Sequence, residues 1–340
     1  MRVAVLTTSY PRTPEDPAGI FVARLVEAAR AQGVEVEVVS PASFRHFGLA
    51  YGHGIVGNLR AAPWKALLLP AFLVSFALAA RRAARAADVV HAHWLPSALV
   101  GLATRKPLVV QPWGSDVALA PWLARLVLAR ARLVVAASPF LARGVPRARI
   151  VPVPVELPDH VGEPDEPPHV LFVGRLSEEK GIVELLEATA GLPRVIVGDG
   201  PVRVPESVGR VAPAELGRYY ERAAVVCVPS RREGYGMVAR EAMAHGRAVV
   251  ATSVGGLADA IVDGETGLLV PPRDPAALRA ALVRLLEDPR PFVQIELEVV
   301  GGVGARASLE HEDVGTALLA VYGDASRSGR AAPGPAGAGS

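Results

Sequence analysis

Glu233 and Glu241 lie eight residues apart in the stretch REGYGMVAREAMAHGRAVVATSVGG, residues 232–256. Carboxylates accept hydrogen bonds from neighbouring hydroxyl groups, such as those of a sugar or a ribose. The glycines at positions 234 and 236 permit a tight turn directly after the first glutamate. By spacing alone, however, two solvated charges on a helix remain the simpler interpretation of this pair.

A helix is expected directly after the turn. It would begin near Met237 and run to about Ala244, and Gly246 would terminate it. The backbone N–H groups of Gly236, Met237 and Val238 would have no partner inside this helix, so they would point at an anion above it. The arrangement suits a sugar nucleotide, with phosphate at the helix start, a sugar hydroxyl on one carboxylate and a ribose on the other.

Two cations flank a second glycine-rich turn, residues 174–181. Arg175 and Lys180 lie five residues apart, directly after an apolar run that we expect to be a strand. Two cations that converge there would neutralise a diphosphate, the arginine as a fork and the lysine as a point charge. A surface pairing with Glu178 or Glu179 explains the spacing equally well.

Glycines also follow other expected strands. Gly19 closes the segment 16–19 ahead of a helix, and Gly198 and Gly200 follow a strand in the second half. Such turns lie at the carboxyl edge of a parallel sheet, where ligands bind, and glycine lets the backbone approach a phosphate. Each glycine taken singly is more simply an ordinary turn.

Polar residues end two expected strands of the first half. A period of two places His91 and His93 on the same side of one strand. A zinc pair is one possibility, but no third ligand is close in sequence, so one histidine at a ligand and one packed inside is favoured. Trp113, Ser115 and Asp116 form a polar loop after the next strand.

Short apolar runs alternate with helical stretches along the whole chain. Several runs are apolar throughout, which is typical of strands buried on both faces in a parallel sheet, and the alternation indicates an α/β fold with doubly wound sheets. The expected strands are 3–6, 34–39, 89–93, 108–111, 133–136, 170–173, 194–197, 225–228, 248–251 and 268–270. One helix is expected after Asp274, a good N-cap that precedes Pro275, and its leucines recur on one face.

A proline-rich, acidic segment, residues 151–168, interrupts the pattern and is expected to be a linker. It divides the chain into domains of residues 1–160 and 161–310. The tail 324–340 lacks bulky apolar residues and is expected to be disordered. Residues 289–312 show no clear pattern.

The composition excludes several classes of protein. The 340 residues suit two domains, and a net charge of +2 argues against a nucleic-acid binder driven by bulk charge. The lone cysteine, Cys227, excludes an internal disulfide and lies in an apolar run, so a buried inert thiol is expected. The first apolar run is too short for a signal peptide, so we expect a cytoplasmic protein.

The segment 66–80 is uncharged, but at about 15 residues it is shorter than a bilayer span. Trp64 and Lys65 precede it, and arginines follow it up to Arg85. A buried helix of the first domain is the simpler interpretation. The alternative is an interfacial helix within residues 64–85, with its arginines facing anionic lipid, in a protein held at the inner membrane face.

Four stretches carry a family resemblance: DVVHAHWLPSALVGL, VLFVGRLSEEKGIVELLEA, VIVGDGP and VPSRREGYGMVAREAMAHGRAVVATSVGGLADAIVDGETGLLVPP. They resemble signatures of the retaining glycosyltransferases of family 4, which have the GT-B fold. The resemblance covers about residues 1–288 and is strongest in 168–272. It implies two Rossmann-like domains that face each other across a cleft, with the acceptor on the first and a nucleotide-diphosphate sugar held mostly by the second.

The resemblance also implies roles for the residues above. Arg175 and Lys180 would contact the diphosphate, which Gly19 would approach from the first domain. Glu233 would hold hydroxyls of the transferred sugar without acting as a nucleophile, and Glu241 would bind the ribose. The further expected site residues are the backbone of Gly234, Tyr235, Gly236, Met237 and Val238 at the sugar and phosphate, His91 or preferably His93 at the reacting face, and Trp113, Ser115 and Asp116 on the acceptor side.

Neither a cofactor nor a metal is expected, because the family lacks an Asp-x-Asp metal motif and cations would carry the charge of the leaving group. The acceptor, whether a sugar, a lipid-linked or a small molecule, is not encoded in a readable motif. Two departures stand out: Trp113 replaces a histidine common in relatives, and the connection 289–312 is short. Residues 311–323 are expected to form a helix that returns to the first domain. The alternatives are an epimerase or hydrolase on the same fold, and a non-catalytic nucleotide-sugar binding protein.

Overall fold

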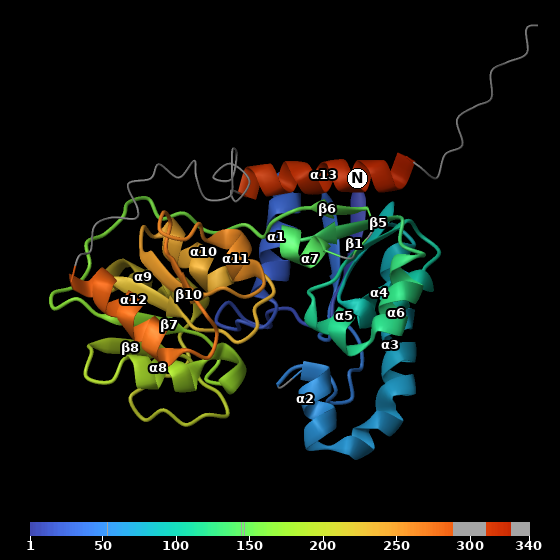
Figure 1. Cartoon of the computed structure of the whole chain (residues 1–340). Helices are drawn as coiled ribbons and strands as arrows, with labels where there is room; N and C mark the ends of the chain where they lie inside the picture. The colour runs from blue at the N-terminus through green and yellow to red at the C-terminus, as the bar shows by residue number, and fades with distance from the viewer. Residues whose placement is uncertain (53, 144, 146, 288–310, 328–340) are drawn as a thin grey trace, which may run out of the picture.

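The computed structural model describes residues 1–52, 54–143, 145, 147–287 and 311–327 of the chain. Within these ranges the strands form two parallel sheets, one in each half of the chain (Figure 1). The first sheet has the order β2-β1-β3-β4-β5-β6 and the second the order β11-β10-β9-β7-β8. Most of the strands form because their apolar runs are buried on both faces, and the predicted doubly wound α/β architecture is confirmed.

The first sheet contains every strand predicted for the first half and one that was not predicted. That strand, β6, has three residues and pairs with β5 only, and two of its residues are exposed, so it lacks the run of β-branched residues by which the others were recognised. The bounds are β1 (Arg2–Leu6), β2 (Glu35–Val39), β3 (Val89–His93), β4 (Leu108–Gln111), β5 (Leu133–Ala136) and β6 (Ala148–Ile150).

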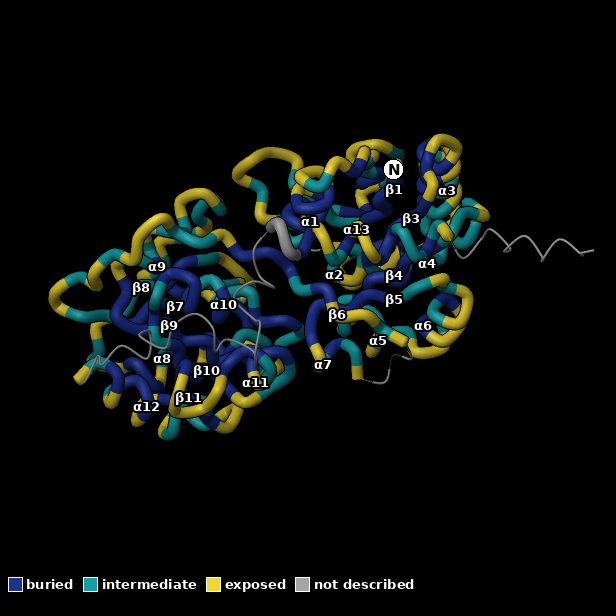
Figure 2. The backbone as a smooth tube through the Cα atoms, turned by 90° about the horizontal axis from the view of Figure 1, so that it is seen from above, coloured by how far each residue is buried: buried dark blue, intermediate teal, exposed yellow. Residues whose placement is uncertain are grey.

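Helices cover both faces of the first sheet. One face packs against α1 and α13, and the other packs against α3, α4 and α6. Figure 2 shows most of the strands of both lobes as buried and many of the outer loops as exposed, whereas β2 and β6 have exposed residues. The helices of this domain are α1 (Ile20–Ala31), α2 (Gly54–Ala61), the 3-10 helix η1 (Pro63–Leu68), α3 (Leu69–Ala84), α4 (Leu95–Leu102), α5 (Ser115–Leu119), α6 (Pro121–Leu128) and α7 (Pro139–Ala142).

The second sheet is built from the predicted strands of the second half. The strands are β7 (Val170–Val173), β8 (Arg194–Val197), β9 (Val225–Val228), β10 (Ala248–Thr252) and β11 (Leu268–Val270). The helices are η2 (Glu178–Lys180), α8 (Ile182–Ala188), η3 (Pro213–Glu215), α9 (Gly217–Arg222), α10 (Met237–Ala244), α11 (Gly256–Ala260) and α12 (Pro275–Glu287). The predicted cap of α12 is confirmed, since Asp274 Oδ1 accepts a hydrogen bond of 2.9 Å from the N–H of Ala277.

The last described helix, α13 (His311–Arg327), lies along α1 of the first domain, as expected (Figure 1). The expected boundary between helix and disordered tail is wrong, because the helix includes residues 324–327. Ala325 is fully buried, and Asp324 pairs with Arg149 of β6 at 2.6 Å. These contacts order residues whose composition alone suggested a tail. The rest of the expected tail and the patternless connection lie outside the described residues.

The proline-rich segment between the sheets has no regular secondary structure, and its first part packs against the first domain. Val151, Val153 and Val155 are buried. Val151 and Val153 pack in the same cluster as α1 and α13. The valine side chains of this segment therefore extend the core of the first domain, up to the point where the chain crosses to the second domain.

Candidate active site

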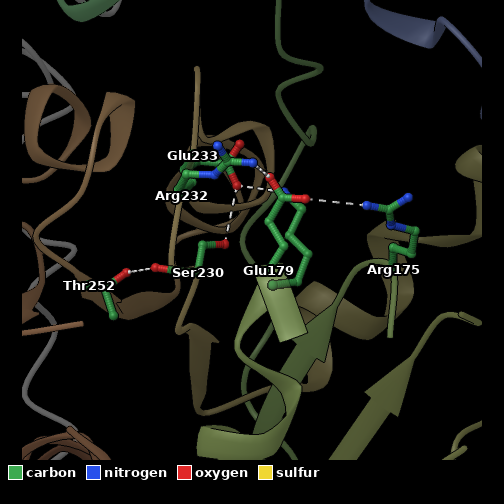
Figure 3. A network of polar contacts seen from close by, with 7 residues as sticks. Arg175, Glu179, Ser230, Arg232, Glu233 and Thr252 are labelled. Atoms are coloured by element: carbon green, nitrogen blue, oxygen red, sulfur yellow. Dashed lines mark hydrogen bonds and ion pairs between the residues drawn. The ribbon is translucent and has the colours of Figure 1, made fainter. Parts of the chain in front are cut away.

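Lys180 and Glu233 form the closest pair of opposite charges in the candidate site. Lys180 Nζ lies 2.6 Å from Glu233 Oε2. The Ser230 hydroxyl donates to the same carboxylate oxygen at 3.3 Å (Figure 3). Lys180 ends η2 after β7, whereas Ser230 and Glu233 follow β9, the neighbouring strand in the sheet. The carboxyl edge of the sheet therefore brings together two groups that are 53 residues apart in sequence.

Arg175 lies beside this pair, although its present partner is another acid. Its Nη2 is 3.5 Å from Glu179 Oε2, and Arg232 Nη2 is 2.9 Å from the other oxygen of the same carboxylate (Figure 3). The predicted surface pairing with Glu179 is thus present. Arg175 and Arg232 are both largely exposed, so these pairs are weak and the guanidinium of Arg175 can turn toward an anion.

Glycines let the two strand-end loops pack closely enough to form this group. A Cβ atom on Gly181 would lie 1.9 Å from the carbonyl oxygen of Pro229, and one on Gly255 would lie 1.8 Å from that of Glu233. Both glycines also have positive φ angles, 73° and 53°. No other residue fits there without moving the loop that carries Glu233.

The helix after the Gly-Tyr-Gly turn begins at Met237, as predicted. Gly236 has a φ of 81° and is the N-cap of α10, and no side chain caps the helix start. The first N–H groups of the helix, including those of Met237 and Val238, therefore have no intrahelical acceptor. Gly246 has a φ of 70° just past the helix end, which confirms the predicted termination.

The ring of Tyr235 points into the protein, which leaves its backbone for the expected contact with the donor. Tyr235 is buried in the core cluster of the first domain. Its hydroxyl accepts from the N–H of Val153 at 3.1 Å and lies 3.3 Å from the carbonyl of the same residue. Tyr235 therefore anchors the site loop to the first domain, and only its backbone can face a ligand. Gly234 lies nearby, against the carbonyl oxygen of Trp113.

Glu241 joins the two domains. Its Oε1 lies 2.8 Å from Arg24 Nη1 of α1, and its Oε2 accepts a hydrogen bond of 2.9 Å from the hydroxyl of Tyr220 in α9. Burial, together with the adjacent carboxylate, raises the pKa of Tyr220 well above its ordinary value, so the phenol stays a proton donor. Sequence reasoning missed both partners, because Arg24 lies 217 residues away and no motif marks it.

These residues line a pocket between the domains with a volume of about 320 Å³. Arg24 enters it from the first domain, and the segment 156–160 forms one wall. Glu241, Tyr220 and His245 come from the second domain. The pocket thus has a carboxylate, a phenol and a guanidinium in reach of one ligand.

Gly19 is the N-cap of α1, with a φ of 70°. A Cβ atom there would lie 2.3 Å from the carbonyl oxygen of Ser9. Glycine is therefore required at position 19 because two segments of this chain lie close together there. No side chain caps the start of α1, as at the start of α10.

His91 and His93 point to the same side of β3, as expected, and their ring centroids are 4.4 Å apart. His91 Nδ1 lies 2.8 Å from the hydroxyl of Tyr322 in α13, so His91 is the packed histidine. Burial lowers the pKa of His91 to about 3 and that of His93 well below its ordinary value. Both rings are therefore neutral at pH 7.

His93 is the better placed of the two for a role near a ligand. Its ring stacks against that of Trp113 at 6.1 Å, next to the interface with Gly234. Both ring nitrogens of His93 and the indole N–H of Trp113 are buried with no hydrogen-bond partner among the described residues. Such groups normally bind water or a polar ligand, because unpaired burial is costly.

Asp116 organises the loop that holds Trp113. Its carboxylate accepts hydrogen bonds of 2.9, 3.1 and 3.1 Å from the N–H groups of Leu95, Trp113 and Val117. Burial raises its pKa. These bonds give Asp116 a role in positioning the loop, and the expected contact with the acceptor stays a prediction. Ser115 begins α5, and its side chain lies outside what the structure describes.

Within the described residues, no group of three or more His, Cys, Asp or Glu side chains is suited to hold a metal ion. Cys227 lies in β9, is fully buried, and burial raises the pKa of its thiol, so it is the inert cysteine expected.

Two family models match the chain. Residues 18–157 match the model described as Glycosyltransferase Family 4, and residues 167–288 match the one described as Glycosyl transferases group 1. Together they cover both domains. The junction between them falls in the proline-rich segment.

Relatives extend over most of the chain. A D-inositol 3-phosphate glycosyltransferase from Acidothermus cellulolyticus is 30% identical, over 90% of this chain and 85% of its own length. The enzyme of the same name from Kineococcus radiotolerans is 32% identical, over 79% of this chain and 82% of its own.

Solved structures share the whole fold. Sucrose-phosphate synthase from Thermosynechococcus elongatus superposes with a TM-score of 0.74 at 25% identity and covers 94% of this chain and 98% of its own. HepE from Anabaena, in complex with UDP-glucose, gives a TM-score of 0.69 at 18% identity and covers 95% and 99%. The two facing parallel-sheet domains are thus those of a GT-B glycosyltransferase. The chain belongs to glycosyltransferase family 4, and it is an enzyme that transfers a sugar.

Proposed function

We propose that this enzyme moves a sugar from a nucleotide-diphosphate sugar to an acceptor hydroxyl, with retention of configuration and without a metal ion or other cofactor. The observation that carries the proposal is the convergence of Lys180 and Glu233 beside the uncapped start of α10. A cation, a carboxylate and free amides in one place match the phosphate and the hydroxyls of such a donor.

The donor would span the two parts of the site. Its sugar and diphosphate would lie at Glu233, Lys180 and the start of α10, and its ribose would bind Glu241 in the pocket between the domains. HepE, which shares the fold, binds UDP-glucose. This supports a nucleotide-sugar donor here and leaves the base and the sugar of this enzyme to experiment.

In the proposed reaction the bond from the anomeric carbon to the diphosphate oxygen breaks, and a bond from that carbon to the acceptor oxygen forms on the same face. The acceptor proton passes to the departing diphosphate oxygen, so no protein nucleophile is needed. Lys180, Arg175 once it has left Glu179, and the amides of α10 would stabilise the charge that develops on the diphosphate.

Lys180 also bonds to Glu233, which gives it a second role. The ammonium holds the carboxylate in place, and a bound diphosphate would share that cation. Glu233 would then accept hydrogen bonds from sugar hydroxyls through its remaining lone pairs. The neutral ring of His93, next to Trp113, would face the sugar from the first domain as a hydrogen-bonding group.

Two measurements test the proposal. A thermal-shift screen against UDP-, GDP- and ADP-sugars identifies the donor, because a ligand that binds the folded state raises the melting temperature. Glu233→Ala and Lys180→Ala should then each abolish transfer while the protein still melts cooperatively. Full activity in either variant contradicts the assignment. Donor consumption without acceptor would favour an epimerase or hydrolase, and tight donor binding without turnover would favour a binding protein.

A further inference from the structure

The helical arm formed by α2, η1 and α3 exposes several large apolar side chains. Trp64 is 63% exposed, Leu67 is 83% exposed, and Val74 and Leu78 are also exposed. In Figure 1 the arm extends from the lower end of the first domain, away from α13. Pro63–Ala84 is the one described helical stretch long and apolar enough to cross a membrane by length and composition.

The opposite side of the arm packs against the first domain. Phe72, Phe76 and Ala80 are buried against the first sheet at a spacing of four residues. Phe44, from the preceding loop, stacks on Phe76 with ring centroids 4.4 Å apart. Because one face is packed in the core, the arm cannot cross a bilayer, and only its outer face is available to a partner.

The outer face has a defined pattern. Within α3, Ala71, Val74 and Leu78 are exposed and spaced by three or four residues, so they form one apolar stripe along the helix, and exposed Leu67 lies just before it in η1. The next positions on this stripe are Arg82 and Arg85. A stripe that is apolar over about two turns and then basic is typical of a helix that lies in a membrane interface.

The charges around the stripe have a single sign. The sequence has no acidic residue between Glu37 and Asp88, whereas Arg60, Lys65, Arg81, Arg82 and Arg85 lie in that interval. None of these five cations forms an ion pair with any described residue. Lys65 and Arg81 donate hydrogen bonds to the backbone carbonyls of Gly48 and Ala103. Cations that have no carboxylate partner and lie beside exposed apolar side chains suit an anionic lipid surface.

The neighbouring helix α6 extends this face. It packs on α4, as does α3, so the helices belong to one layer on the sheet. Trp122 is 70% exposed at its start, with Leu126 one turn further on and Arg125 between them. No acidic residue follows in the sequence until Glu156.

We propose that this face, made of Trp64, Leu67, Val74, Leu78 and Trp122 with the surrounding arginines, docks the enzyme on an anionic phospholipid bilayer. Tryptophan prefers the headgroup region of a membrane, and arginine reaches phosphates from a buried stem. The docking goes beyond the transfer reaction and does not depend on it.

Sedimentation with vesicles tests the proposal on the full chain. Vesicles of phosphatidylcholine with one-third phosphatidylglycerol should bind the protein about tenfold more strongly than vesicles of phosphatidylcholine alone, and raising the salt from about 0.05 to about 0.5 M should reduce this binding. The double variant Trp64→Ser/Leu67→Ser should lower binding about tenfold. Arg82→Glu/Arg85→Glu should remove the preference for anionic vesicles.

The matched control is Val208→Ser/Val262→Ser, which removes two exposed apolar side chains from the second domain and should leave binding unchanged. Each variant must melt cooperatively and keep the donor-induced melting shift, so failure to dock is distinguished from failure of the donor site. Equal sedimentation of Trp64→Ser/Leu67→Ser and the parent, or no binding of the parent to anionic vesicles, overturns the proposal. So does a dimer in solution that the double variant dissociates, because the face would then join two copies of the chain.

Discussion

Arg24 and Glu241 form an ion pair of 2.8 Å that joins α1 of the first domain to α10 of the second. Both side chains are largely buried, and Tyr220 holds the second carboxylate oxygen. The residue assigned to the ribose is therefore already oriented before a donor arrives. Its partner comes from the other domain, so the position of Glu241 depends on how the domains meet.

Arg24→Met should cost about 3 kcal/mol of unfolding free energy, because it leaves a buried carboxylate without its cation. Arg2→Met is the matched control. It removes an ion pair of 2.7 Å with Glu35 that is exposed on both sides, and should cost less than about 1 kcal/mol. Urea denaturation of both variants measures the difference, and equal costs would show that the Arg24 pair adds nothing.

Gly181→Ala should destabilise the protein and weaken donor binding, because its Cβ would collide with Pro229 and displace Lys180. Gly264→Ala is the control, since Gly264 has a similar φ of 80° and no atom within 4 Å of its Cβ position. It should cost only the backbone strain of about 1 kcal/mol. Equal melting temperatures for the two variants would contradict the packing argument.

Tyr235→Phe should lower the unfolding free energy by about 1–2 kcal/mol and leave donor affinity unchanged, since its hydroxyl bonds to the buried backbone of Val153. Tyr219→Phe, on the partly exposed side of α9, is the control for stability. Calorimetry and a donor titration check the two parts. If the variant had normal stability and bound the donor poorly, the Tyr235 hydroxyl would have to contact the donor, which would contradict the anchoring role.

Acid should destabilise the protein through His91. Its pKa is about 3 in the folded protein and near 6.5 in the unfolded chain, so the unfolded chain takes up a proton first. The stability is complete above pH 6.5 and is lost as the pH falls toward 3. At pH 5.5 the loss is about 1.4 kcal/mol from His91 alone. His91→Gln should show a smaller fall in unfolding free energy between pH 7.5 and pH 5.5 than the parent, and an unchanged fall would contradict the assignment.

The fold was predictable because most strands are buried on both faces and leave a continuous apolar signal. β2 instead alternates valine with glutamate, and the short edge strand β6 shows neither pattern. The groups at the carboxyl edge were predictable for the same reason, since parallel strands bring Lys180 and Glu233 to one edge whatever their separation in sequence. Arg24 and the anchoring role of Tyr235 were not predictable, because they depend on how the two domains meet, and that contact leaves no period or motif in either half. Tyr220 lies in the same domain as Glu241 but on a different helix, and no motif marks its contact with the carboxylate.

Glu233, held by Lys180, is proposed to bind the transferred sugar. Isothermal titration of the parent and of Glu233→Gln tests this role most directly. Each protein is titrated with the nucleotide sugar identified in the thermal-shift screen and with the corresponding nucleoside diphosphate. The parent should bind the nucleotide sugar more tightly than the diphosphate alone. Glu233→Gln should keep its affinity for the diphosphate within about twofold and lose about tenfold in affinity for the nucleotide sugar, the loss expected for hydrogen bonds to a charged group. An unchanged ratio of the two affinities would contradict the claim.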